Sequence, residues 1–342
     1  MLVVMADDGI AFDGTTPERA PLGGAEGAFV SLAEAFWARG HRVLARNQCA
    51  APVTYKGVEW APLAQGLPAR ADLYIANRGD RLIGRVPAPA KIFWIHNPGR
   101  YLKKPRYVLA LLRHRPVIVT LGPHHAATVP WWLPSGGRAV IPYGIAAPFR
   151  EHRPPRAPPP PRAIFTSNPL RGLSWLLDLW ERRIHPLVPR AELHLYCGPA
   201  VYGAVGDRSA AAMGAVLARA DALAPHGVRR HAPLPREQLI GALEQSRVML
   251  YRGDAGETFC LAVAEAQAMG VPAVVQDIGA VAERVIDGET GTVARDDERF
   301  CAAAIALLTD DALWRRQHHA ALARQHGQSW DEAAQRFEAL AA

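Results

Sequence analysis

Short apolar runs alternate with segments of helical period over the first part of the chain. The apolar run LVVMADD at 2–8 is followed by a helical pattern at 24–40, and further strand-like runs occupy residues 41–47, 71–77, 90–97, 116–122 and 138–144. This alternation is typical of helices packed on a parallel sheet. It predicts an α/β half with a core that contains Val3, Val4, Ile92, Phe93, Ile118 and Val119.

A second series of the same kind follows a proline-rich segment. The segment RPPRAPPPPRA at 153–163 predicts a linker, because proline removes amide donors and favours a stiff, extended backbone. Beyond it, strand-like runs such as AELHLYCG and VPAVVQD alternate again with helical segments. The predicted division is a first α/β domain at 1–150, a linker at 151–162, a second α/β domain at 163–325 and a C-terminal amphipathic helix at 326–342.

The composition is that of a folded protein of enzyme size. The chain has 342 residues, which is enough for two cores, and 49% hydrophobic with 21% charged residues argues against extensive disorder. No apolar stretch approaches the roughly 18 residues of a membrane helix. The cysteines are widely spaced, which suggests neither a zinc site nor a disulfide scaffold, so we expect a reducing cytoplasm: Cys49, Cys197, Cys260 and Cys301.

The net charge of +7 is moderate, and basic residues are densest in one cluster. Such a cluster can bind phosphates, an anionic membrane surface or nucleic acid, or it can simply be a solvated helix face. Nucleic acid is the weakest of these readings, because no recognition motif accompanies the charge. The cluster consists of Arg100, Lys103, Lys104, Arg106, Arg113, His114 and Arg115.

Two glutamates follow the apolar run RVMLYRG at a regular spacing. Glu257 and Glu265 lie eight residues apart. If a helix begins at this point, the carboxylates are separated by a rise of about 12 Å and by about 80° around the axis. They can then contact two ends of an elongated ligand, while the unpaired amides of residues 258–261 form an anion site. The plainer alternative is a helix cap at Glu257 and a solvated face at Glu265.

The segment E-TFCLAVA-E-AQAMGVPAVV resembles the family 4, or group 1, retaining glycosyltransferases, in which two glutamates are separated by seven residues. The resemblance implies the GT-B architecture: α/β, with two Rossmann-like domains whose parallel sheets face a central cleft. It also implies that Glu257 contacts the donor sugar and acts as a catalytic electrostatic partner, and that Glu265 binds the ribose. The diphosphate would be held by the backbone of Thr258, Phe259, Cys260 and Leu261.

The same resemblance extends to other positions. Arg171, which precedes Gly-Leu, occupies the place of a residue that reaches the donor phosphates, although residues 166–168 lack the second basic residue that many members have. Gly23 and Gly24 match the family's glycine loop, and His96 matches a catalytic histidine beside the donor sugar and the acceptor hydroxyl; His124 and His125 have weaker claims.

Three further features of the chain are compared with the family: one residue, one helix and one pocket. Tyr143 stands where the family usually has asparagine, which puts local donor or hinge contacts in doubt. The C-terminal helix is expected to pack back on the first domain, as in other GT-B proteins. The nucleobase pocket is expected at Gly198, His231 and Ala232.

The function implied is transfer of a sugar, with retention, from a nucleotide-diphosphate sugar to an acceptor hydroxyl. No cofactor or metal is expected, since no Asp-x-Asp motif stands at a suitable strand end. The donor nucleotide is open among UDP, GDP and ADP. A lipid-linked or lipopolysaccharide acceptor, with peripheral membrane association, fits the basic cluster.

Two alternatives to a transferase remain. One is a non-catalytic sugar-nucleotide or glycan-binding scaffold. The other is a sugar-nucleotide epimerase, which the glutamate motif argues against. A phosphorylase would need a cofactor lysine, but the lysines lie in the first half.

Overall fold

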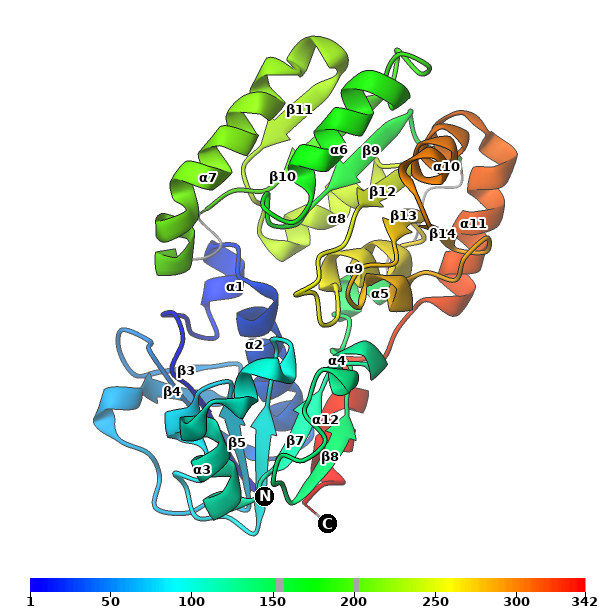
Figure 1. Ribbon diagram of the computed structural model, residues 1–342. Coiled ribbons are helices and arrows are strands. Elements are labelled where there is room, and N and C mark those ends of the chain that lie inside the picture. Colours follow the sequence, from blue (N-terminus) through cyan, green and yellow to red (C-terminus); the bar gives the residue numbers. More distant parts are fainter. Residues whose placement is uncertain (152–156, 200–202, 342) are drawn as a thin grey trace. The chain divides into compact units, whose positions relative to one another are not determined.

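The computed structural model describes residues 1–151, 157–199 and 203–341, and it contains two compact units (Figure 1). Unit 1 comprises Met1–Arg19, Gly23–Gly144 and Gln328–Ala342, and unit 2 comprises Ala20–Leu22 and Ile145–Gly327. Apart from the short segment Ala20–Leu22, the chain therefore passes from unit 1 to unit 2 after Gly144 and returns to unit 1 after Gly327. Of the predicted linker, residues 152–156 lie outside the described residues.

Unit 1 contains an eight-stranded sheet in the order β3-β4-β2-β1-β5-β6-β7-β8. Its neighbouring strands pair in parallel except for the hairpin β3-β4, which is antiparallel. The hairpin was not predicted from the sequence. The strands are β1 (Leu2–Asp7), β2 (Arg42–Asn47), β3 (Val53–Tyr55), β4 (Val58–Pro62), β5 (Leu73–Asn77), β6 (Ala90–Trp94), β7 (Val117–Thr120) and β8 (Gly137–Val140).

Helices cover this sheet on both sides (Figure 1). Helix α3 packs through Tyr107 and Leu111 on the face that carries Val4 and Phe93, and these four residues belong to one buried cluster. The α-helices of unit 1 are α1 (Thr16–Arg19), α2 (Gly24–Ala38), α3 (Pro105–His114), α4 (Pro123–Ala127) and α12 (Trp330–Glu338), and its 3₁₀ turns are η1 (Leu63–Gln65), η2 (Asp80–Leu82) and η3 (Gly99–Lys103).

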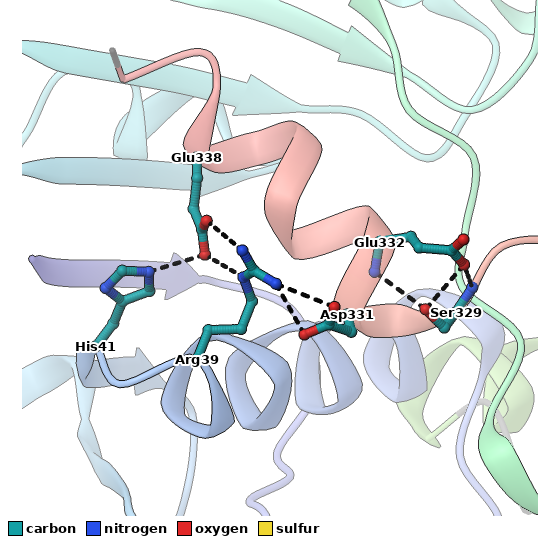
Figure 2. Close-up of polar contacts among 6 residues, drawn as sticks. All are labelled: Arg39, His41, Ser329, Asp331, Glu332 and Glu338. Atoms are coloured by element: carbon teal, nitrogen blue, oxygen red, sulfur yellow. Dashed lines mark hydrogen bonds and ion pairs between the residues drawn. The ribbon is translucent and has the colours of Figure 1, made fainter.

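Helix α12 packs on α2. The rings of Phe36 and Phe337 meet edge to face, and Arg39 donates to both carboxylate oxygens of Glu338 at 2.6 and 2.9 Å (Figure 2). Ser329 caps the start of α12 through a reciprocal capping box with Glu332. These contacts join the end of the chain to the second helix.

Unit 2 contains a six-stranded parallel sheet in the order β11-β10-β9-β12-β13-β14. Its strands are β9 (Arg162–Phe165), β10 (Glu192–Tyr196), β11 (Val228–His231), β12 (Val248–Tyr251), β13 (Ala273–Gln276) and β14 (Gly291–Ala294). Its α-helices are α5 (Ala147–Arg150), α6 (Leu173–Leu179), α7 (Gly203–Ala222), α8 (Arg236–Glu244), α9 (Leu261–Ala268), α10 (Asp297–Thr309) and α11 (Asp311–Arg324), with a π turn η4 (Trp180–Ile184) and 3₁₀ turns η6 (Ala224–His226) and η7 (Val281–Arg284).

The predicted α/β class is confirmed in both units. All six predicted core residues, from Val3 to Val119, are at most 1% exposed. The strands are central and buried on both faces, which explains why they read as continuous apolar runs. Within the described part of the chain, every helix is too short or too polar to cross a bilayer. The four cysteines are free and buried.

Candidate functional site

Glu257 lies in the loop that follows β12, and its buried carboxylate accepts three hydrogen bonds. The Arg171 guanidinium donates to Oε2 at 2.7 Å, and the Tyr251 hydroxyl donates to the same oxygen at 2.9 Å. The backbone N–H of Cys260 donates to Oε1 at 3.2 Å. Donors of this kind hold the carboxylate in one orientation.

The helix after Glu257 begins later than predicted. Helix α9 starts at Leu261 with Cys260 as its N-cap residue, so Thr258 and Phe259 belong to the preceding turn. The predicted rise and angle between the two glutamates therefore do not apply, because Glu257 is not in the helix. The Cys260 amide, which was expected to be available to an anion, is bonded to Glu257.

The backbone of Cys260 explains this late start. Its φ of 64° is left-handed, a conformation that costs a residue with a side chain about 1 kcal/mol or more. Cys260 is also buried, and burial raises the pKa of its thiol well above the usual value. The turn thus carries local strain directly beside the Glu257 carboxylate, as strained residues at functional sites often do.

Arg171 is presented by a tight turn after β9. Asn168 shapes this turn: its side-chain oxygen accepts from the amide of Leu170 at 2.9 Å, and its backbone oxygen accepts from the amide of Arg171 at 2.9 Å. Gly172 has φ +78°, and a Cβ there would lie 2.9 Å from the Cβ of Arg252, so the turn needs glycine. The Arg171 side chain is 37% exposed, and its guanidinium therefore has access to solvent.

Glu265 lies in α9 and is buried, with 5% exposure. This burial excludes the alternative of a solvated helix face. The alternative of Glu257 as the helix cap is also wrong, because the cap position belongs to Cys260. Both plain interpretations of the glutamate pair therefore fail, while the ligand roles of the two residues stay predictions.

The residues predicted to form a nucleobase pocket lie in two adjacent loops. Gly198 follows β10, and His231 and Ala232 lie at the end of β11, which pairs with β10. The His231 ring stacks on Tyr196, with centroids 4.5 Å apart. The structure thus brings these residues to neighbouring strand ends, and their contact with a base stays a prediction.

His96 follows β6 in unit 1, and both of its ring nitrogens are hydrogen-bonded. Asn77 donates through its amide nitrogen to Asp7, so its carbonyl oxygen is the group that faces His96. The Nε2–H of His96 must then donate to Asn77, and Nδ1 accepts from the Tyr143 hydroxyl. Burial lowers the pKa of His96 well below its usual value, so the ring is neutral.

Asp7 anchors this chain of hydrogen bonds at the end of β1. Arg78 donates to both of its oxygens, at 2.9 and 3.1 Å, and the amide of Gly9 donates at 2.7 Å. Burial raises the pKa of Asp7, although Arg78 opposes that rise. Arg78 has φ 52° and also pairs with Glu26 in the first turn of α2, at 2.9 Å.

Gly23 and Gly24 form the N-terminus of α2, as N-cap and first residue. A Cβ at Gly24 would meet nothing within 4 Å, so the backbone there faces open space. These two glycines and His96 belong to unit 1, whereas Arg171, Glu257 and Glu265 belong to unit 2. The predicted site shared by both domains therefore stays a prediction.

His125, which had a weaker claim, is a structural histidine. It is fully buried; Nδ1 accepts from the amide of Leu121 at 3.1 Å, and Nε2 donates to the carbonyl of Asn97 at 2.9 Å. Burial lowers its pKa to about 4. Its role is to support the loop that follows His96.

Sequence reasoning missed Tyr251, Asn77 and Asp7 as partners of the site residues. Each is the last residue of its strand, in β12, β5 and β1, where parallel sheets place ligand-binding side chains. That position was the available signal. Among the residues that the structure describes, no group of three or more His, Cys, Asp or Glu side chains is arranged to hold a metal ion.

Part of this chain matches a family of known proteins. Residues 161–310 match the family model of the glycosyl transferases group 1. Over 117 residues, or 34% of this chain, the sequence is 32% identical to D-inositol 3-phosphate glycosyltransferase of Corynebacterium diphtheriae. That match spans 27% of the relative's length.

Two solved structures share the architecture over almost their whole length. Sucrose-phosphate synthase from Thermosynechococcus elongatus has a TM-score of 0.74 at 16% identity, covering 99% of this chain and 98% of that one. HepE of Anabaena, solved with UDP and glucose, has a TM-score of 0.71 at 15% identity, covering 98% of both chains. The predicted GT-B fold is thereby confirmed.

Proposed function

We propose, from the match of residues 161–310 to the group 1 glycosyl transferases, that the protein transfers a sugar from a nucleotide-diphosphate sugar to an acceptor hydroxyl. The observation that carries the proposal is the Arg171–Glu257 pair. It lies inside the matched segment, where the loops after β9 and β12 meet. Ligands of open parallel sheets bind at these strand ends.

The pair has the chemistry that a donor requires. Arg171 is partly exposed and can bind two phosphate oxygens at once, which offsets the charge of the leaving diphosphate. Glu257 is held by Tyr251 and the Cys260 amide, so it keeps its position when Arg171 turns to a phosphate. Glu257 is then able to accept hydrogen bonds from donor-sugar hydroxyls, and Glu265 is proposed to bind the ribose.

The finer features of the reaction are proposals from the family resemblance. Transfer proceeds with retention of the anomeric configuration and without a metal. Arg171, in place of a metal ion, offsets the charge of the leaving diphosphate. His96 is assigned to the catalytic machinery of unit 1 in its neutral, Nε2–H form. We take UDP as the first donor base to test, because HepE was solved with UDP and with UDP-glucose. The proposed acceptor is lipid-linked, with the protein on an anionic membrane surface.

The experiment is a thermal-shift panel of UDP, GDP, ADP and their common sugar conjugates on wild type and Glu265→Ala. A ligand at a hundredfold excess over its dissociation constant stabilises the protein by about 2.7 kcal/mol, which such a panel detects. We expect a shift with one base that the substitution weakens. Release of free nucleotide diphosphate from that sugar conjugate, followed with candidate acceptors, then reports turnover, and proton NMR of the product anomer reports retention.

Three outcomes would contradict the proposal at different levels. No shift with any nucleotide removes the donor assignment. A shift without turnover across acceptors favours the non-catalytic scaffold, and a donor sugar that is isomerised instead of transferred favours the epimerase. Turnover that stops with EDTA and returns with Mg²⁺ would contradict metal independence.

A further inference from the structure

The net positive charge of this protein comes from one continuous segment. Residues 81–150 contain 11 Lys and Arg and no Asp or Glu, whereas the other 272 residues contain 28 Lys and Arg and 32 Asp and Glu. The chain as a whole is therefore basic only because of this segment. All of it but the last six residues lies in unit 1.

Within this segment, the outward face of α3 combines apolar and basic side chains. Tyr107 and Leu111 point into the core, whereas Leu109 and Leu112 are 66% and 57% exposed on the opposite side. Arg113 lies one turn after Leu109 and shares its face, since residues four apart are neighbours on a helix. An exposed leucine pair flanked by cations is typical of a helix that lies on a membrane surface.

Lys103 and Lys104 add two exposed cations immediately before α3. Arg106 is also exposed, but it pairs with Asp80 at 3.5 Å. Arg106 is therefore left out of the surface that we define below, because part of its charge is neutralised by this carboxylate.

Two adjacent tryptophans lie in a turn beside α3. Leu133 donates its amide to the carbonyl of Pro130 at 3.2 Å, which places Trp131 and Trp132 at the centre of the turn. Their side chains are 86% and 48% exposed. Val129 and Leu133 flank the turn and are buried in the same cluster as the inward residues of α3. The turn and the helix therefore pack on the same hydrophobic core.

This tryptophan turn is held in place by two arginines. Arg138 donates to the carbonyl oxygens of Pro130 and Trp131, at 2.7 and 2.9 Å. Arg115, the residue after α3, donates to the carbonyl oxygen of Ser135 at 3.2 Å. The exposed indoles are thus presented by a fixed backbone, which reduces the entropy lost when they are buried against a partner.

We propose that this surface, which consists of Lys103, Lys104, Leu109, Leu112, Arg113, Trp131 and Trp132, docks the protein on an anionic lipid bilayer. We name it the docking surface. Indole rings prefer the interface between headgroups and acyl chains, and each nearby Lys or Arg strengthens binding to anionic lipid. Residues 81–150 contain no acidic residue that an anionic membrane would repel, so their positive charge complements the negative charge of the lipid.

A lipid bilayer fits these observations better than other occupants. A nucleic acid attracts the cations but offers no layer for two exposed leucines and an outward tryptophan pair. This proposal rests on the proposed lipid-linked acceptor, and it adds the surface by which the protein binds the membrane. Its test uses neither donor nor acceptor, so it can fail while the transfer assignment stands.

The experiment is co-sedimentation of the full chain with sucrose-loaded vesicles of phosphatidylcholine, with and without phosphatidylglycerol, at low salt. Wild type is expected to bind the anionic vesicles and to bind the neutral ones much more weakly. Lys103→Glu/Lys104→Glu/Arg113→Glu is expected to weaken binding to anionic vesicles at least about 100-fold, because the loss of each cation costs about fivefold and each new carboxylate is repelled by the anionic lipid. Trp131→Ser/Trp132→Ser is expected to weaken it about tenfold and to leave a residual binding that high salt removes.

Unit 2 offers matched controls. Arg182→Glu/Arg183→Glu/Arg190→Glu makes the same change of net charge at three exposed arginines, and Leu187→Ser removes a leucine that is 71% exposed. Both are expected to bind vesicles within about twofold of wild type, apart from the long-range effect of charge, which a Debye length of about 8 Å limits. A cooperative thermal unfolding transition without ligand, near that of wild type, confirms that each variant is folded.

Each of three results would overturn the proposal. Equal loss of binding in the unit 2 charge variant means that net charge alone acts. Unchanged binding of the tryptophan variant means that the turn does not enter the bilayer. Binding of a double-stranded oligonucleotide that exceeds vesicle binding, and that the tryptophan variant retains, assigns the surface to nucleic acid instead.

Discussion

The two units hold their polar residues in opposite ways. In unit 1, Asp7, Asn77, His96 and Tyr143 form a buried chain in which each member pairs with the next. In unit 2, Glu257 is buried, but the arginine that binds it is more than one-third exposed. A carboxylate in a closed chain keeps its partners, whereas a carboxylate with a partly solvated arginine can exchange that partner for a ligand.

This difference separates stability from binding. A buried hydrogen bond is costly to break, because the partner left behind loses its solvation as well as its bond. A partly exposed ion pair contributes little to stability, since water screens it and can replace it. Substitutions at Asp7 and Asn77 in the unit 1 chain should therefore act mainly on folding, and substitutions at Arg171 mainly on ligands.

The largest effect is expected from Asn77→Ala. This change leaves the Nε2–H of His96 without its acceptor in the core and removes one of the hydrogen bonds to the charged Asp7, which Arg78 still binds, so the unfolding free energy of unit 1 should fall by about 3 to 4 kcal/mol. Urea unfolding combined with hydrogen exchange at β1 and β5 measures the loss in that unit. The control is Asn168→Ala in the Arg171 turn, which removes one exposed hydrogen bond and should cost about 1 kcal/mol or less. Equal losses in the two variants would remove the distinction between the regions.

The second prediction concerns pH and the loop that supports His96. The pKa of His125 is about 4 in the folded chain and about 6.5 in the unfolded chain, so the native state binds fewer protons between these values. The His125 contribution of about 3 kcal/mol is present above pH 6.5 and is lost as the pH falls toward 4. NMR titration of labelled histidine should place the His125 midpoint near 4. A midpoint near 6.5 would show that the ring is not enclosed as described.

The fold was more predictable from the sequence than the site was. Apolar runs such as those of β1 and β6 mark buried parallel strands because both faces are covered, and they were read correctly. The hairpin β3-β4 was missed, because its short strands are partly exposed and carry a weaker pattern. Position after a strand pointed to Glu257, and the family resemblance pointed to Arg171; the structure brings the two side chains to 2.7 Å.

What the sequence did not reveal depends on contacts between distant residues. Tyr143 was noted as a departure from the family pattern, but its bond to His96 joins positions 47 apart and appears only when β6 and the segment after β8 are neighbours. The start of α9 was misplaced because helical period says nothing about one left-handed residue at Cys260. Such features follow from tertiary packing, not from local pattern.

The third prediction tests whether the exposed arginine serves a ligand. Arg171→Ala should weaken the binding of the preferred nucleoside diphosphate about 10- to 100-fold, since a hydrogen bond to a charged group contributes about 1.5 to 3 kcal/mol. Calorimetric affinity for the parent nucleoside, which has no phosphates, should be unchanged. Arg252→Ala is the matched control, because that guanidinium stacks on Trp175 and its Nε donates to Gln276. Equal weakening of nucleoside and diphosphate would assign Arg171 a structural role.

A smaller effect is expected from Tyr251→Phe, which removes one donor from the Glu257 carboxylate and keeps the ring. If Glu257 binds the donor sugar, the affinity advantage of the sugar conjugate over its nucleoside diphosphate should fall about fivefold, while the affinity for the diphosphate stays constant. Competition binding of the two ligands measures this advantage. A parallel loss for both ligands would mean that the hydroxyl supports the whole loop instead of orienting Glu257.

The smallest effect concerns the strained turn between Glu257 and α9. The informative result is which of two variants, Cys260→Gly or Cys260→Ala, is the more stable. At most positions alanine is more stable than glycine, because glycine loses more backbone entropy on folding. At Cys260, φ is 64°, so alanine keeps the left-handed strain and glycine relieves it. Cys260→Gly should therefore unfold at a higher urea concentration than Cys260→Ala, with a difference of about 1 kcal/mol. The ordinary order, with alanine the more stable, would mean that the turn relaxes in solution and that the Cys260 amide is not held against Glu257.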